Sequence, residues 1–140
     1  SITGILTVVG RTPVNWMSKR QGAVETSTYG AEFLAMRTAV EEAISIRYML
    51  RALGVPITRS TNLYGDNLGV IQNASNPDSS LKKKHTAISY HRVRECVAAR
   101  IVDPFKILSG ENYADMLTKA LNSPLYKFHV NAIFDEPGHQ

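Results

Sequence analysis

The sequence predicts a layered α/β domain. Segments with strand character alternate with segments of helical periodicity along the 140 residues, which is the pattern of a sheet covered by helices. Hydrophobic residues make up 44% and charged residues 20% of the chain, close to the averages for globular proteins. No apolar run approaches the roughly 20 residues of a membrane span, so we expect no membrane partner. This length is enough for one domain with a hydrophobic core.

The first elements predict a β-hairpin. Residues 2–9 are rich in β-branched side chains and end at Gly10, which favours a strand. Residues 11–13 form the turn, and a second strand starts over residues 14–17. Residues 19–21 are polar and are expected to connect the hairpin to the next element.

Residues 26–53 carry the strongest helical pattern. Apolar side chains recur at spacings of three and four, at Phe33, Met36, Val40, Ala43, Ile46, Leu50 and Leu53. A row of alanines at every fourth position from Ala31 to Ala43 lets this helix lie close to a sheet. Gly54 followed by Pro56 ends it.

The second half predicts shorter elements. We expect a strand over 61–64, a helix over 68–74, a loop over 76–80, a helix over 86–100, a strand over 104–108 and a helix over 112–121. Residues 1–121 then form the domain, and residues 122–140 form a C-terminal tail of uncertain order.

Charge and cysteine content limit the partners and the compartment. The net charge of +4 and the pI of about 9.3 are compatible with nucleic-acid binding. A single cysteine, Cys96, excludes an internal disulfide and fits a reducing compartment. His85 and His91 with this cysteine do not have the spacing of a zinc site.

Three carboxylates stand in separate predicted elements. Glu32 lies early in the long helix, Asp66 at the end of a strand, and Asp115 near the start of a short helix. Hard divalent cations take oxygen ligands, and a two-metal site draws carboxylates from several elements. Each residue also has a structural interpretation, since Asp commonly caps helices and acidic residues favour their first turns.

The three carboxylates and the motifs around them resemble those of a known family, the ribonuclease H domain of copia-type retrotransposon polyproteins. Matching pieces occur in family order over residues 1–121, at residues 1–4, 16–21, 26–33, 65–67, 84–85, 90–95 and 114–121. They include Thr-Ser-Thr-Tyr-Gly-Ala-Glu-Phe around Glu32, Gly-Asp-Asn around Asp66, and Ala-Asp-Met-Leu-Thr-Lys-Ala-Leu around Asp115. Residues 122–140 carry no recognised motif.

The resemblance implies a ribonuclease H-like three-layer fold, a mixed sheet with helices on both faces. It also implies endonucleolytic cleavage of RNA in RNA–DNA hybrids during reverse transcription. Glu32, Asp66 and Asp115 would hold two Mg2+ (or Mn2+) ions. The implied partners are an RNA–DNA hybrid and the reverse transcriptase portion of the same polyprotein, in the cytoplasm (within a virus-like particle) or in the nucleus.

Two departures from the family pattern affect this expectation. The family's first metal-binding Asp lies on a central first strand just before the stretch that matches residues 1–4. No Asp precedes Asp66 here, and Glu25 is the only acidic residue before Glu32. We therefore expect a missing central strand, a gap that residues 2–9 could fill by shifting, and impaired activity. The mobile His of several cellular ribonucleases H has no counterpart in residues 109–113.

Nucleic-acid contacts are expected from a basic cluster and from two neighbouring loops. The candidates are Lys19, Arg20, Asn67, Lys82, Lys83, Lys84, His85, His91 and Arg94. A charge run of this kind can also be an ordinary solvated surface. Trp16 and Tyr90 could stack on bases, although we expect Trp16 to pack in the core.

Two other functions are compatible with parts of the pattern. A degenerate or co-opted fragment would bind nucleic acid without cleaving it. A related nuclease or integrase is disfavoured, because residues 114–121 match the ribonuclease H pattern.

Overall fold

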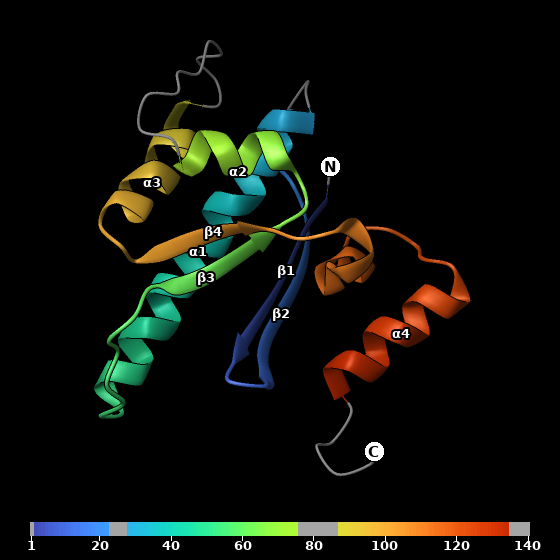
Figure 1. Cartoon of the computed structure of the whole chain (residues 1–140), viewed down its shortest axis with the longest axis horizontal. Coiled ribbons are helices and arrows are strands. Elements are labelled where there is room, and N and C mark those ends of the chain that lie inside the picture. The colour runs from blue at the N-terminus through green and yellow to red at the C-terminus, as the bar shows by residue number, and fades with distance from the viewer. Residues whose placement is uncertain (1, 23–27, 76–86, 135–140) are drawn as a thin grey trace.

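The computed structural model describes residues 2–22, 28–75 and 87–134. Two short sheets and a group of helices form one α/β arrangement (Figure 1). In chain order the elements are β1 (Ile2–Val9), β2 (Thr12–Arg20), α1 (Thr28–Ala52), β3 (Thr61–Gly65), α2 (Leu68–Ser75), α3 (Ala87–Ala98), β4 (Val102–Lys106), the 3-10 helices η2 (Ser109–Glu111) and η3 (Tyr113–Leu117), and α4 (Ser123–Phe134).

The predicted hairpin is present, with a longer second strand than expected. β1 and β2 pair in antiparallel fashion, and the register shifts once, between Thr7 and Val8. Gly10 takes a positive φ of 63° in the turn, a conformation that glycine adopts without strain. Lys19 and Arg20 were expected in a connection, but they pair with the first residues of β1 and so end the strand.

The strands form two separate sheets. β3 and β4 pair in parallel from Thr61↔Val102 to Gly65↔Lys106, whereas β1 pairs with β2. The expected single mixed sheet is therefore not formed by the described strands, because none of them lies between β1 and β3. Residues 2–9 have not shifted into a central place.

The side of β3 that points away from β4 has no strand partner within the described residues. The Thr61 amide donates to the Ile101 carbonyl, and the Gly65 carbonyl accepts from the Ile107 amide, both at 2.9 Å. These bonds lie on the β4 side. Since backbone groups alternate along a strand, those of Asn62 and Tyr64 point to the opposite side. β3 therefore presents a free edge.

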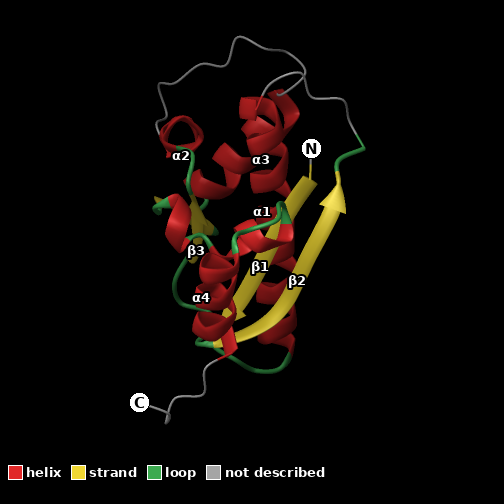
Figure 2. Cartoon of the chain, turned by 90° about the vertical axis from the view of Figure 1, so that its right-hand side faces the viewer, coloured by secondary structure: helices red, strands yellow, loops and turns green. Residues whose placement is uncertain are grey.

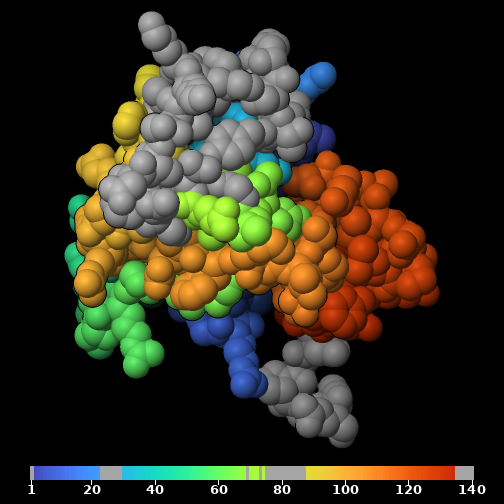
Figure 3. Space-filling view, turned by 45° about the horizontal axis from the view of Figure 1, so that its top comes forward, coloured from blue at the N-terminus to red at the C-terminus, as the bar shows by residue number. Residues whose placement is uncertain are grey.

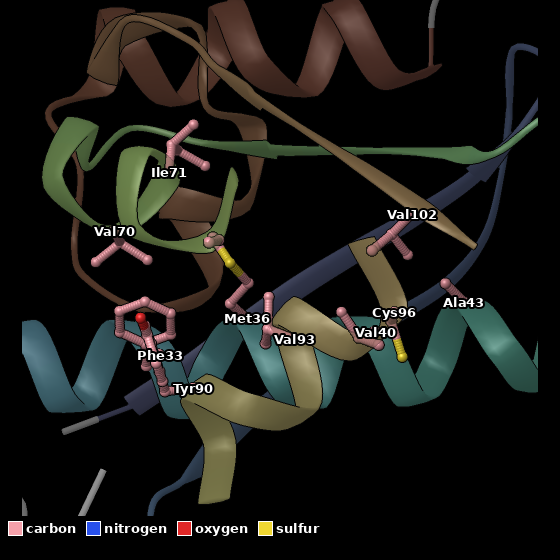
Figure 4. Close-up of a cluster of buried hydrophobic side chains, with 11 residues drawn as sticks. Phe33, Met36, Val40, Ala43, Val70, Ile71, Tyr90, Val93, Cys96 and Val102 are labelled. Atoms are coloured by element: carbon pink, nitrogen blue, oxygen red, sulfur yellow. The ribbon is translucent and has the colours of Figure 1, made fainter. Parts of the chain in front are cut away.

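Helix α1 packs against both sheets and against α2 and α3. The core combines buried side chains from α1, α2, α3 and β4, namely Phe33, Met36, Val40, Ala43, Val70, Ile71, Ala74, Tyr90, Val93, Cys96 and Val102 (Figure 4). The rings of Phe33 and Tyr90 meet edge to face, 5.5 Å apart. The periodicity of residues 26–53 therefore predicted the core-facing side of this helix correctly from Phe33 to Ala43, whereas Leu53, expected on the same side, is 74% exposed.

Both faces of β1 contact other elements. Thr3 and Ile5 are buried, and the Gln21 amide donates to the Thr3 hydroxyl and to the Ala31 carbonyl, so this face lies toward α1. Successive strand residues point to opposite faces, and at Gly4 the opposite face meets η3. Figure 2 shows α1 and α4 in relation to this hairpin.

Residues 109–117 form two 3-10 helices, where one helix over residues 112–121 was expected. The amides of Glu111, Asn112, Asp115 and Thr118 each bond to the carbonyl three residues earlier. The Asn112 side chain accepts from the Ala114 amide and caps η3. The short helix η3 lies against β1 at Gly4.

The structure adds a helix, α4, where a tail of uncertain order was expected. The Asn122 side chain accepts from the Leu125 amide at 3.0 Å and starts the helix, and Pro124 fits its first turn. His129 is fully buried and lies edge-on to Tyr113 of η3, with 5.2 Å between ring centroids. Neither ring nitrogen of His129 has a hydrogen-bond partner within the described residues.

Trp16 is 61% exposed, so the expectation that it packs in the core is wrong. It lies opposite Leu6 on the face of the hairpin that η3 meets at Gly4. Tyr90, which was considered for base stacking, is instead buried in the core. None of the helices in the described part of the chain is long and apolar enough to cross a membrane.

The contact between Gly4 and η3 predicts a large effect of one added methyl group. A Cβ at Gly4 would lie 2.5 Å from the Thr118 methyl carbon and 3.0 Å from the Ala114 carbonyl oxygen. Gly4→Ala should therefore lower the free energy of unfolding by about 1–3 kcal/mol through overpacking. Chemical denaturation followed by circular dichroism measures this change.

Gly110→Ala is the matched control, because a Cβ there meets nothing within 4 Å. We expect that variant to keep or slightly raise stability. Equal stability of the two variants would contradict the close packing of η3 on β1.

Candidate functional site

Three elements carry the three candidate carboxylates. Glu32 is on α1, one turn beyond its start, Asp66 directly follows β3, and Asp115 is in η3. All three side chains are partly buried. Asp66 follows the carboxyl end of a parallel strand, where ligand sites of α/β sheets are found.

The electrostatics of Glu32 show that the three carboxylates are neighbours. Burial raises the pKa of Glu32 above its usual value, and the negative charges of Asp66 and Asp115 raise it further. Lys119 opposes this shift. Tertiary structure has therefore gathered acidic groups that are far apart in the sequence, at some cost in stability.

Asp66 does not act as the helix cap that its sequence position suggested. The side chain of Asn67 accepts from the Val70 amide at 3.1 Å and caps α2. This contact gives Asn67 a structural role and leaves its predicted nucleic-acid contact a prediction. Since Asn67 supplies the cap, Asp66 is not needed for this purpose.

Asp115 is held by two neighbours within its own segment. One carboxylate oxygen lies 3.2 Å from the Lys119 ammonium, and the other accepts from the Asn112 side-chain amide at 3.4 Å. Only 14% of the Asp115 side chain is exposed. Sequence reasoning did not assign a role to Lys119, although the i,i+4 spacing of the pair signals this ion pair.

Gln21 is a second residue that sequence reasoning missed. Its amide nitrogen lies 3.0 Å from both the Thr3 hydroxyl and the Ala31 carbonyl, so it joins β1 to α1 directly beside Glu32. Its amide oxygen is buried and has no hydrogen-bond partner within the described residues. Gln21 thus positions the helix that carries Glu32.

The predicted nucleic-acid contacts fall into three groups. Lys82, Lys83, Lys84 and His85 lie outside the described residues. Lys19 and Arg20 are exposed at the end of β2, and His91 is exposed on α3. Arg94 donates to the Tyr90 hydroxyl at 2.6 Å and lies over the same ring. These positions leave the predicted surface untested.

The carboxylates fit a divalent cation in chemistry but do not complete a site. Their oxygens are the ligands that Mg2+ prefers, and a cation would relieve the repulsion around Glu32. Within the described ranges, however, no group of three His, Cys, Asp or Glu side chains could hold a metal ion. Metal binding by these carboxylates therefore stays a prediction.

Comparison with known proteins identifies homologues among transposon polyproteins. The chain is 31% identical over 95% of its length to the retrovirus-related Pol polyprotein from transposon RE1 of Arabidopsis thaliana, and 30% identical over 87% to that from transposon RE2. It is 33% identical over 93% of its length to the retrovirus-related Pol polyprotein from transposon TNT 1-94 of Nicotiana tabacum.

The matched segment covers 9%, 8% and 10% of these three relatives, respectively, so the chain spans a tenth of their length or less. No protein-family model and no solved structure matches the chain. The similarity therefore supports a fragment of a retrotransposon Pol polyprotein and does not specify the activity of this segment.

Because the pKa of Glu32 is raised, replacing this carboxylate by a neutral side chain should raise the stability of the protein, and the gain should depend on pH. The folded state holds the Glu32 proton more tightly than the unfolded state does. The contribution of this group to the free energy of unfolding is therefore fully present below the unfolded pKa of 4.5, and it is lost as the pH rises through the pKa of the folded state. Glu32→Gln should raise the free energy of unfolding at pH 7. Solvent screening limits the gain to about 1 kcal/mol or less.

Thermal denaturation at pH 7 and at pH 3.5 measures this effect, and we expect the gain to vanish at the lower pH. Glu111→Gln, at an exposed position in η2, is the control and should change stability little. A loss of stability in Glu32→Gln at pH 7 would contradict the repulsion.

Proposed function

We propose that this chain is the ribonuclease H-type segment of a retroelement Pol polyprotein and that it contributes to divalent-metal-dependent cleavage of RNA in RNA–DNA hybrids. One observation carries the proposal. Glu32, Asp66 and Asp115 come from three different elements, and two of them raise the pKa of the third. The similarity to transposon Pol polyproteins supports the polyprotein context.

The cost of this arrangement supports a functional role. A half-buried carboxylate beside two other carboxylates opposes folding, and groups with perturbed pKa values are enriched at functional sites. The Lys119 ammonium offsets part of the charge at Asp115. No structural role of these residues in the described part of the chain accounts for the remaining repulsion of Glu32 by Asp66 and Asp115.

The division into two sheets supports an incomplete site. α1 contacts β1 and β3, one strand from each sheet, and the side of β3 away from β4 has no strand partner within the described residues. An extended segment of the same polyprotein between these strands would satisfy their backbone groups and join the sheets. It would also place side chains beside the three carboxylates, where the resemblance expects a fourth ligand.

Each residue then has a defined role in the completed site. Glu32, Asp66 and Asp115 would bind the cations, Gln21 would position α1, and Lys119 would hold Asp115 in place. Bound Mg2+ or Mn2+ would supply charge neutralisation at the phosphate and would activate water. Lys19, Arg20, His91 and Arg94 would contact the nucleic-acid backbone.

A non-catalytic nucleic-acid-binding fragment is the second candidate. The observation that favours it is the lack, within the described residues, of any three-residue group that could hold a metal ion. This candidate predicts salt-sensitive binding to nucleic acid and no metal-dependent cleavage, even in a longer polyprotein.

A hybrid-cleavage assay distinguishes the two candidates. The longer polyprotein from the same gene should cut the RNA strand with Mg2+, and the 140-residue chain by itself should be inactive or severely impaired. Asp66→Asn in the longer protein should lower the rate at least about 100-fold, because losing a metal ligand removes several kcal/mol of transition-state stabilisation.

Asp103→Asn is the matched control, since Asp103 is exposed on β4, outside the carboxylate group. We expect its rate to stay within about twofold of the unmodified protein. Robust Mg2+-dependent cleavage by the 140-residue chain, abolished by Asp66→Asn, would refute the incomplete site. Salt-sensitive binding without cleavage in the longer protein would favour the second candidate.

A further inference from the structure

We propose that α4 belongs to the functional unit and that His129, at its centre, is a positioning residue that holds Asp115 in place through η3. The inference rests on the proposed function, because it concerns the same carboxylate group. It extends the functional unit beyond residues 1–121, the range that the sequence predicts for the domain.

η3 is a weak element by itself. It has five residues, and none of them is fully buried. Its backbone hydrogen bonds join the Asp115 amide to Asn112 and the Thr118 amide to Asp115, and the bond geometry of such 3-10 helices is poorer than that of an α-helix. The position of η3, and with it that of Asp115, therefore depends on the elements that contact it.

The hairpin provides one of these contacts. A Cβ at Gly4 would lie 3.0 Å from the Ala114 carbonyl oxygen, so β1 and η3 approach each other closely. The Ser18 hydroxyl of β2 donates to the Leu117 carbonyl. The ion pair between Lys119 and Asp115 is local, so it moves with the segment and does not fix Asp115 relative to the other carboxylates.

Helix α4 provides a second contact. The ring of His129 lies edge-on to the ring of Tyr113, with 5.2 Å between their centroids, and the ring of Phe128 lies 6.5 Å from that of Tyr113. Figure 3 shows α4, in red, against the orange segment that contains η3. Tyr113 is two residues from Asp115, so a shift of α4 would reach this carboxylate within one helical turn.

His129 occupies the centre of the inward face of α4. Leu125, His129 and Ile133 follow one another at four-residue spacing, and His129 is fully buried whereas the other two are partly buried. Edge-to-face packing of two rings stabilises a contact beyond the burial of apolar area. Removing the His129 ring would therefore loosen the packing of α4 on η3.

The surroundings of His129 indicate that it acts through packing. Neither ring nitrogen has a hydrogen-bond partner within the described residues. The side chain is fully buried, so it does not reach a nucleic acid on the surface. A phenylalanine ring has a similar shape and leaves no buried nitrogen unpaired. His129→Phe should therefore preserve the positioning of Asp115, whereas His129→Ala should not.

Hydrogen exchange measured by NMR in the 140-residue chain tests the contact without cleavage. In His129→Ala the amides of Asp115 and Thr118 should exchange at least about tenfold faster, because η3 loses one of its contacts, whereas the core amide of Val40 should keep its rate. His129→Phe should leave all three rates unchanged. Tyr126→Ala is the matched control on the same helix, because Tyr126 is 51% exposed.

Cleavage of RNA–DNA hybrids by the longer polyprotein tests the consequence for Asp115. His129→Ala should lower kcat about tenfold and raise the Mg2+ concentration that gives half-maximal rate about tenfold, because a metal ligand loses its support. The KM for the hybrid should change little, since the buried ring does not contact the substrate. A merely structural role would lower the amount of folded protein and leave the Mg2+ dependence unchanged. His129→Phe and Tyr126→Ala should match the unmodified protein.

Each contrary result has a defined meaning. Unchanged exchange of the η3 amides in His129→Ala would overturn the contact, and faster exchange with an unchanged Mg2+ dependence would overturn the positioning role. If His129→Phe behaves like His129→Ala, the role of ring packing is refuted. If the longer polyprotein cuts no hybrid, the proposed nuclease function fails, and the exchange rates still decide whether His129 holds η3 and Asp115 in place.

Discussion

The packing of α1 holds the described part of this protein together. No backbone hydrogen bonds from a shared strand join the two sheets there, so side-chain contacts must do so. Helix α1 contacts β1 of one sheet and β3 of the other. Its buried row from Phe33 to Ala43 also forms the centre of the core. The same helix carries Glu32 near one end and Arg47 and Arg51 near the other.

The carboxylate group depends on this packing because it opposes folding. Burial and two neighbouring negative charges disfavour ionised Glu32, and the apolar core must outweigh that repulsion. Lys119 compensates one member, Asp115, through a local ion pair. The helix position of Glu32 is further held by Gln21, which bonds to β1 and α1. A divalent cation would convert the repulsion among these carboxylates into attraction. An arrangement that lowers the stability of one part of a polyprotein can in this way serve the chemistry of the polyprotein.

The proposed function gives the separated sheets and the grouped carboxylates a common explanation. A strand between β1 and β3 would join the sheets through backbone bonds and would reach the carboxylates at the end of β3. Exposed strand edges also invite non-native pairing, so an edge left free in the described part of the chain carries a risk of aggregation. The similarity to segments of much longer Pol polyproteins supports a fragment of a retrotransposon polyprotein.

The sequence by itself determined the elements with strong local patterns. Residues 2–9 form the expected strand, and the helix expected over 26–53 is described from Thr28 to Ala52, because β-branched clustering and apolar periodicity are local signals. The sequence also identified Glu32, Asp66 and Asp115 as candidates, but their proximity is a tertiary property. Only the tertiary structure decided that Asn67 rather than Asp66 caps α2, that η3 fits against Gly4, that Trp16 stays exposed and that the sheets remain apart. Each of these depends on which distant segments meet, and local propensity does not encode those contacts.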